Sequence, residues 1–290
     1  MHASSRAALA EVRERLDALT RPASGLLERA KDRLTSTPRA ASGSDLTGLA
    51  DELFAVARLL DGQPSLRRAL SDPSGKPDDR AGLARRLLSG KVSDATLELV
   101  EAMARQRWSR PLDLVEAAET IAVEAALDAA DVDGQLDGVE DELFRFGRIV
   151  AGDPDLSRVL SDRSGSAKGK ADLLERLLAN KVSPVTALLL RNVLTASHLG
   201  HADTAIERLS ESASARRGRS VAFVTTAVAL TDAQEQRLTA ILGRLYGRTI
   251  GLQVTVDPDV LGGLVIRVGD EVIDGSVVHR LEAAGRRLTG

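Results

Sequence analysis

Residues 51–54, Asp-Glu-Leu-Phe, return unchanged as residues 141–144, and they mark an internal repeat with an offset of ninety positions. Of the 50 positions between 51 and 100, 24 are identical to their counterparts in 141–190. A whole module copied in tandem is typical of an extended scaffold, because each copy folds as a unit and offers a binding face. The repeat ends near residue 217, and a tail of different character follows.

Apolar residues in both copies recur at spacings of three and four, which predicts amphipathic helices. The opening helix of the first copy carries Leu46, Leu49, Leu53, Val56 and Leu60, and that of the second carries Leu136, Val139, Leu143, Phe146 and Val150. Ser93 and Ser183 have the side chain and the position expected of N-caps. Pro184 fits the first helical position that follows Ser183. Each copy is therefore predicted to be a small helical bundle.

The stretch from Pro111 to Ala130 fits two places in this repeat. It matches the last helix of the second copy at the ninety-residue offset, and it also precedes the second copy as its first helix. We therefore expect one helix to serve both bundles and to join them rigidly. The predicted organisation is an amphipathic helical extension and linker (1–44), a first bundle (45–130), a second bundle (111–217) and a C-terminal domain (218–290).

The tail changes from helical to strand periodicity. Residues 221–228 are predicted to form a strand, and Thr231 with Gln234 has the pattern of a capping box that opens a helix to about Tyr246. Strict alternation predicts strands over 250–256 and 264–268, and a short strand over 271–273. A last helix is expected from residue 276, with Val277, Leu281 and Leu288 on one face. The fold class is thus α+β and mostly α: two tandem helical bundles sharing a connecting helix, then a small α/β domain.

Composition excludes several classes of protein. The 290 residues include no cysteine, so disulfides and thiolate metal sites cannot form, and a reducing compartment, by default the cytoplasm, is expected. Net charge is −3, and one Trp, one Tyr and four Phe are the only aromatic residues, a composition that argues against nucleic-acid binding. No apolar stretch approaches the length of a spanning helix, so membrane association is expected to be indirect.

Three stretches resemble known ligand-binding motifs, but none of them has the residues or spacing that the motif requires. Residues 165–171 suggest a phosphate-binding loop but have three residues between the glycines, lack the hydroxyl after lysine and follow no strand. Residues 131–144 do not fit a calcium loop: with Asp133 as the first ligand Gly138 is in place but Phe144 stands where the glutamate must be, and with Asp131 first Leu136 stands at the glycine position. His198 and His201 flank Gly200, which favours a helix boundary, and no third metal ligand is evident. We therefore expect no catalytic, cofactor-binding or metal residue, and not an enzyme.

An ordered series of short motifs in the tail resembles the delta subunit of F-type ATP synthases, the oligomycin-sensitivity-conferring protein family. The series is Val224-Thr-Thr-Ala227 with Leu230-Thr231, Val256-Asp-Pro258, Leu261-Gly-Gly-Leu264, Val268-Gly-Asp270 and Ile273-Asp-Gly-Ser-Val277, ending in Leu281. The second copy looks like the six-helix bundle of this family, so the resemblance covers about 180 residues. The first copy departs from the short form of the family and is similar to longer relatives with a duplicated bundle.

The resemblance implies a noncatalytic stator subunit that ties the catalytic head to the peripheral stalk, on the cytoplasmic face of the cell membrane. It implies that a groove between the first and fifth helices of the bundle receives an N-terminal helix of an alpha subunit. In the second copy the groove candidates are Ile121, Ala125, Leu189 and Val193. Peripheral-stalk subunits of the b type are expected on the C-terminal domain, with Val277, Leu281 and Leu288 as candidates. Core packing is an alternative role for all seven residues.

Two questions stay open at this point. A helical-repeat adaptor or regulatory protein unrelated to ATP synthesis would show the same bundles, but it would not predict the ordered series in the tail. The extra first bundle could brace a second stalk chain or could take a second alpha-subunit helix.

Overall fold

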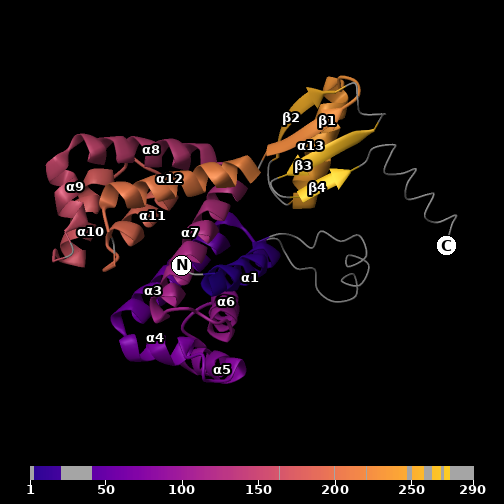
Figure 1. Ribbon diagram of the computed structural model, residues 1–290. Helices are drawn as coiled ribbons and strands as arrows, with labels where there is room; N and C mark the ends of the chain where they lie inside the picture. The colour runs from indigo at the N-terminus through magenta and orange to yellow at the C-terminus, as the bar shows by residue number, and fades with distance from the viewer. Residues whose placement is uncertain are drawn as a thin grey trace. The chain divides into compact units, whose positions relative to one another are not determined.

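The computed structural model describes residues 3–20, 41–162, 164–198, 200–219, 221–246, 250–257, 263–268 and 271–274. The chain divides into two compact units, Met1–Ala213 and Ser214–Gly290. The described residues are mostly helical, and a small mixed sheet lies in the C-terminal unit (Figure 1).

The N-terminal unit contains only helices among its described residues. Its first half holds α1 (Ala3–Thr20), α3 (Gly43–Gly62), α4 (Pro64–Ser71), α5 (Pro77–Leu88), α6 (Asp94–Arg105) and α7 (Pro111–Val132). Its second half holds α8 (Leu136–Gly152), α9 (Pro154–Ser161), α10 (Ala167–Leu178), α11 (Pro184–Leu194) and the part of α12 (Ala202–Arg219) up to Ala213. The helix predicted for 111–130 is α7, and the opening helices of the two copies are α3 and α8.

Side-chain caps fix where several of these helices begin. Ser93 and Ser183 cap α6 and α11 by accepting hydrogen bonds from the amides of Thr96 and Thr186, which confirms both predicted N-caps. At α3 a full capping box joins Ser42 and Asp45. This cap starts the helix at residue 43, whereas the linker was predicted to extend to residue 44.

The helix α7 lies at the centre of the unit, and 15 of its 22 residues are buried. It packs along α3 and also against α1, α4, α6, α8 and α11. Figure 1 shows it running from the group of α1 and α3–α6 to the group of α8–α12. Seven of its buried residues are alanines, which let neighbouring helices approach closely. One continuous apolar core results, reaching from Ala8 to Ala213 and including residues of both copies.

The C-terminal unit is a four-stranded sheet with one described helix. The strands β1 (Val221–Thr226), β2 (Gly251–Val256), β3 (Leu264–Val268) and β4 (Glu271–Asp274) have the order β2-β1-β3-β4. β1 pairs with β2 in parallel, and the other two pairings are antiparallel. The helix α13 (Asp232–Tyr246) connects the parallel pair and begins at the predicted capping box of Thr231 and Gln234.

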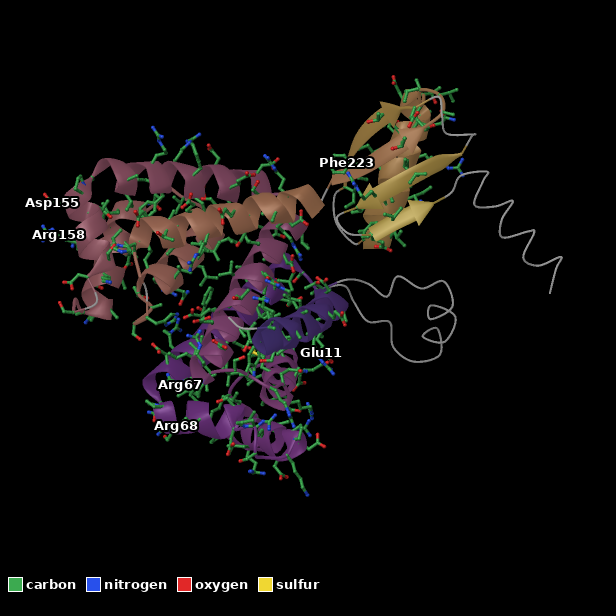
Figure 2. All side chains as sticks on the ribbon, in the orientation of Figure 1. Glu11, Arg67, Arg68, Asp155, Arg158 and Phe223 are labelled. Atoms are coloured by element: carbon green, nitrogen blue, oxygen red, sulfur yellow. The ribbon has the colours of Figure 1, made fainter. Side chains whose placement is uncertain are left out.

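Alternate residues of the sheet build its small core. Ala222 and Val224 of β1 pack with Ile266 and Val268 of β3, and Leu242 of α13 joins them. The opposite face is more open: Arg267 lies over the ring of Phe223, with 5.2 Å from the guanidinium carbon to the ring centroid. Phe223 is labelled in Figure 2. Strand β1 ends at Thr226, short of the predicted residue 228, and Val228 is exposed.

None of the described helices is both long enough and apolar enough to cross a membrane.

Candidate functional site

A concave surface of about 830 Å³ lies within the N-terminal unit. Three helices of the second copy build most of it, and we call it the α7–α11–α12 groove; α1 adds one side chain, Arg13. Its lining includes Thr120, Val123, Val193, Ala196, Ala205 and Leu209. The positions from α7 follow a spacing of three and four, which places them on one face of that helix.

The floor of the groove is apolar. Val123 and Leu209 are buried, whereas Val193, Ala196 and Ala205 are half-buried and keep part of their surface accessible. Small and branched side chains of this kind leave room for another side chain to pack against them. The floor can therefore accept the apolar face of an amphipathic helix, the helix-in-groove mode of recognition.

Ion pairs line the rim of the groove. The guanidinium of Arg13 lies 2.6 Å from the Glu124 carboxylate, and that of Arg110 lies 3.8 Å from Glu116. Arg13 and Arg110 are 43% and 52% exposed, so solvent screens these pairs and each contributes little to stability. Such rim charges are suited to orienting a charged partner during association.

His198 and Glu119 form a partly buried polar pair in the groove. The Nε2 atom of His198 lies 2.9 Å from a carboxylate oxygen of Glu119 on α7. That hydrogen bond raises the pKa of His198 above its usual 6.5, although burial of the ring acts in the opposite direction. The other ring nitrogen, Nδ1, is buried and has no hydrogen-bond partner. The pair ties the segment after α11 to α7 within the groove.

The structure separates the four groove candidates. Ile121, Ala125 and Leu189 have no exposed surface and belong to the core of the N-terminal unit, so a partner cannot contact them without displacing neighbouring helices. Val193 lines the α7–α11–α12 groove and is accessible. The role of Val193 in binding a partner stays a prediction. Val277, Leu281 and Leu288, the stalk candidates, lie outside the described residues.

Sequence reasoning missed the pairing of His198 with Glu119. The two residues are 79 positions apart, and no local pattern connects them. His198 drew attention only as a potential metal ligand beside His201. Within the described part of the chain, no group of three or more His, Cys, Asp or Glu side chains is placed to hold a metal ion.

A second hollow lies where α9 and α10 meet, and it contains the stretch that suggested a phosphate loop. Residues 164 and 165 form a turn, and Ser166 caps α10 by accepting from the amide of Gly169. The ammonium group of Lys170 is turned inward and donates to the carbonyl of Leu160 at 2.7 Å. Burial lowers the pKa of Lys170, and Asp162 acts against that shift. On the outer side of this end of the unit, Arg158 pairs with Asp155 across one turn of α9 (Figure 2).

Comparisons with known proteins add a family and close relatives. A family model described as ATP synthase delta (OSCP) subunit matches residues 123–288. A protein of Streptomyces griseus named ATP synthase subunit delta is 46% identical over 290 residues, with both chains covered completely. One of Streptomyces coelicolor with the same name is 46% identical and covers 99% of this chain and 98% of its own. The N-terminal half, outside the matched family region, is thus shared with these relatives.

Among solved structures, a chain of a Toxoplasma gondii mitochondrial ATP synthase hexamer is similar, with 21% identity, a TM-score of 0.30 and coverage of 58% of this chain and 95% of that chain. A TM-score of this size does not establish a common arrangement.

Proposed function

Because this chain belongs to the ATP synthase delta (OSCP) family, we propose that it is the noncatalytic stator subunit that links the catalytic head of an F-type ATP synthase to its peripheral stalk. A stator must hold the head against the torque of the rotor while ATP is made. Stiff, continuously packed helices meet that demand, and the buried helix α7 supplies such an element. The subunit catalyses no reaction itself.

The α7–α11–α12 groove is the proposed site for an N-terminal helix of an alpha subunit. The observation that carries this proposal is the half-buried apolar floor of Val193, Ala196 and Ala205 between charged rims. An amphipathic helix would bury its apolar face on this floor and align its charges with the ion pairs above it. Ile121, Ala125 and Leu189 would then support the floor from below.

The remaining partners follow from the same family membership. We infer that the C-terminal unit holds peripheral-stalk subunits of the b type, with Val277, Leu281 and Leu288 as candidate contacts. The N-terminal unit is interpreted as two tandem bundles that share α7. In that interpretation the first bundle either braces a second stalk chain or takes a second alpha-subunit helix. The whole subunit would lie at the cytoplasmic face of the cell membrane and reach the membrane only through the complex.

A peptide-binding experiment tests the groove. A synthetic peptide with the N-terminal sequence of the alpha subunit from the same assembly is titrated into the full chain by calorimetry. We expect Ala205→Glu to weaken binding at least about tenfold, because it places a charge on a desolvated apolar floor. Ala55→Glu, at an exposed position of α3, is the matched control and should bind like the natural chain.

Two outcomes count against the proposal at different levels. Equal affinities for the Ala205→Glu and Ala55→Glu variants would show that the peptide binds elsewhere. A chain that neither binds the peptide nor co-sediments with the catalytic head would favour the alternative, a helical adaptor unrelated to ATP synthesis.

A further inference from the structure

The two copies use one equivalent surface in opposite ways. Phe54 of α3 and Phe144 of α8 occupy the same position of the repeat, in the identical stretch Asp-Glu-Leu-Phe. Phe54 is 3% exposed, whereas Phe144 is 61% exposed. Both helices turn their principal apolar face to the core, with Leu53 and Leu143 fully buried. The difference therefore concerns a second face of the helix.

On α3 this second face contacts the other copy, and its phenylalanine is buried. Asp51, Phe54, Arg58 and Asp61 follow spacings of three and four, so they form one stripe along the helix. Three polar contacts join the stripe to α11 and the residues just after it. Arg191 lies 3.7 Å from Asp51, Arg58 donates to the side-chain oxygen of Asn192, and the hydroxyl of Ser197 donates to Asp61. The polar residues on both sides of the buried Phe54 are thus held against the second copy.

The equivalent stripe on α8 is open. It consists of Asp141, Phe144, Arg148 and Ala151, which we call the α8 stripe, and all four residues are exposed. Asp141 pairs with Arg145 one turn away, at 2.6 Å between two side chains that are 52% and 74% exposed. A pair so exposed is weak and can be exchanged for another partner.

A neighbouring residue shows that the contrast is specific to the stripe. Ile149 of α8 is also apolar and 58% exposed, but it lies five positions after Phe144 and so on a different side of the helix. Its counterpart on α3, Leu59, is 41% exposed as well. Ile149 and Leu59 are therefore exposed in both copies, as are most of the charged residues of the two stripes, whereas the phenylalanine changes from buried in α3 to exposed in α8.

We propose that the α8 stripe is a docking surface for an amphipathic helix of another subunit of the assembly. The contact between α3 and α11 defines the chemistry of that helix. It would offer an apolar face over Phe144, a cation near Asp141 and a carboxamide or another acceptor near Arg148. Ala151 stands at the position that Asp61 has in the first copy. The partner helix would therefore make an apolar contact there, in place of the hydrogen bond that Ser197 donates to Asp61.

A second copy of this chain is not the fitting occupant. The helix that contacts the α3 stripe is α11, and in every copy α11 is already engaged by the α3 of its own chain. The α8 stripe is also a separate surface from the α7–α11–α12 groove, whose lining includes no residue of α8. The inference therefore goes beyond the proposed alpha-subunit groove and does not depend on it.

Photo-crosslinking in the assembled ATP synthase tests the proposal directly. Phe144 is replaced with the photoreactive analogue p-benzoylphenylalanine in the full chain, and Ile149 is replaced in the same way as the control. We expect the probe at 144 to crosslink to a helical segment of another subunit in the complex, at several times the yield of the probe at 149. A crosslink to residues 214–290 of the same chain would overturn the proposal, as would a crosslink between two copies of the free chain.

A charge substitution supplies the second measurement. Phe144→Glu and Ile149→Glu are compared for retention on the complex during washing at moderate salt, after circular dichroism confirms that both variants fold. We expect Phe144→Glu to dissociate about tenfold faster, because a charge would be buried where an aromatic ring should pack. Equal retention of the two variants would overturn the proposal, whatever the outcome at the α7–α11–α12 groove.

Discussion

At the scale of single residues, the most informative feature is a glutamate that binds the first turn of a neighbouring helix in each copy. Glu52 binds the start of α6, and Glu142 binds the start of α11. The carboxylate of Glu52 accepts hydrogen bonds from the amide and hydroxyl of Ser93 and from the hydroxyl of Thr96. Glu142 accepts from the amide of Ser183 and the hydroxyl of Thr186 in the second copy. The N-cap serines thus serve twice, because they cap one helix and bind it to another.

Glu52→Gln should destabilise the protein in a pH-dependent way. Burial raises the pKa of Glu52, but the hydrogen bonds from Thr96 and Ser93 outweigh it and leave the pKa below its usual 4.5. A lowered pKa means that the stabilisation is present above pH 4.5 and is lost as pH falls through the folded-state value. We expect the variant to lose about 1 kcal/mol of unfolding free energy at neutral pH.

Urea unfolding checks this prediction at neutral pH and again about one unit below pH 4.5. The difference between the natural chain and Glu52→Gln should shrink at the acidic pH. A difference that stays constant would show that the carboxylate charge plays no part.

The pair of His198 and Glu119 predicts the opposite pH dependence. Because the pKa of His198 is raised above 6.5, its contribution to stability is present below that pH and is lost as pH rises through the folded-state value. The unfolding free energy should therefore fall between about pH 6 and pH 8 by more in the natural chain than in Glu119→Gln. NMR titration of the His198 ring measures the shift itself, and an unshifted titration would contradict the pairing.

At the scale of elements, the repeat predicted most helices because apolar spacing reports the buried face of each one. Apolar spacing cannot show which other element packs against that face. Ile121 and Leu189 have the spacing expected of a groove and of a core alike, and the structure places both in the core. Phe54 and Phe144 both end the stretch Asp-Glu-Leu-Phe, yet the first is buried and the second is exposed, a difference that this shared stretch does not predict. Contacts between distant segments, such as Glu119 with His198, leave no local signal.

Ala125→Leu tests the role of α7 as the central element. Ala125 is fully buried in a close-packed region, so the larger side chain should lower the unfolding free energy by about 1–3 kcal/mol. Since α7 packs against both α3 and α11, hydrogen exchange should speed up in both helices together.

Ala55→Leu is the matched control, because Ala55 is exposed on α3 and its substitution should change the unfolding free energy by less than about 0.5 kcal/mol. Faster exchange confined to one of the two helices would contradict a core shared by both copies.

At the scale of the whole molecule, the first copy is part of the packing of the second rather than an appendage. The continuous core includes Val12 of α1 and Leu53 of α3 together with Leu143 and Leu189 of the second copy. A stator gains from this arrangement, because force applied at one half passes through buried contacts instead of a flexible tether. The C-terminal unit has a core of its own.

Truncation tests whether the second copy depends on the first for its packing. A fragment of residues 111–290 would keep α7 but lose α1, α3, α4 and α6, which cover much of its surface. Buried residues such as Val115 and Ala118 would then face water, and the exposed apolar surface would favour association. A fragment of residues 1–213 keeps the entire N-terminal unit and its core.

We therefore expect the two fragments to behave differently in thermal unfolding and in binding of a hydrophobic dye. The 1–213 fragment should unfold in one cooperative transition close to that of the same unit in the full chain, whereas the 111–290 fragment should bind dye and lose cooperativity in its helical part. A cooperative, dye-free 111–290 fragment would mean that the second copy is independent of the first. In that event the first copy would be an added module, and stiffness would have to come from the partners instead of from the shared core.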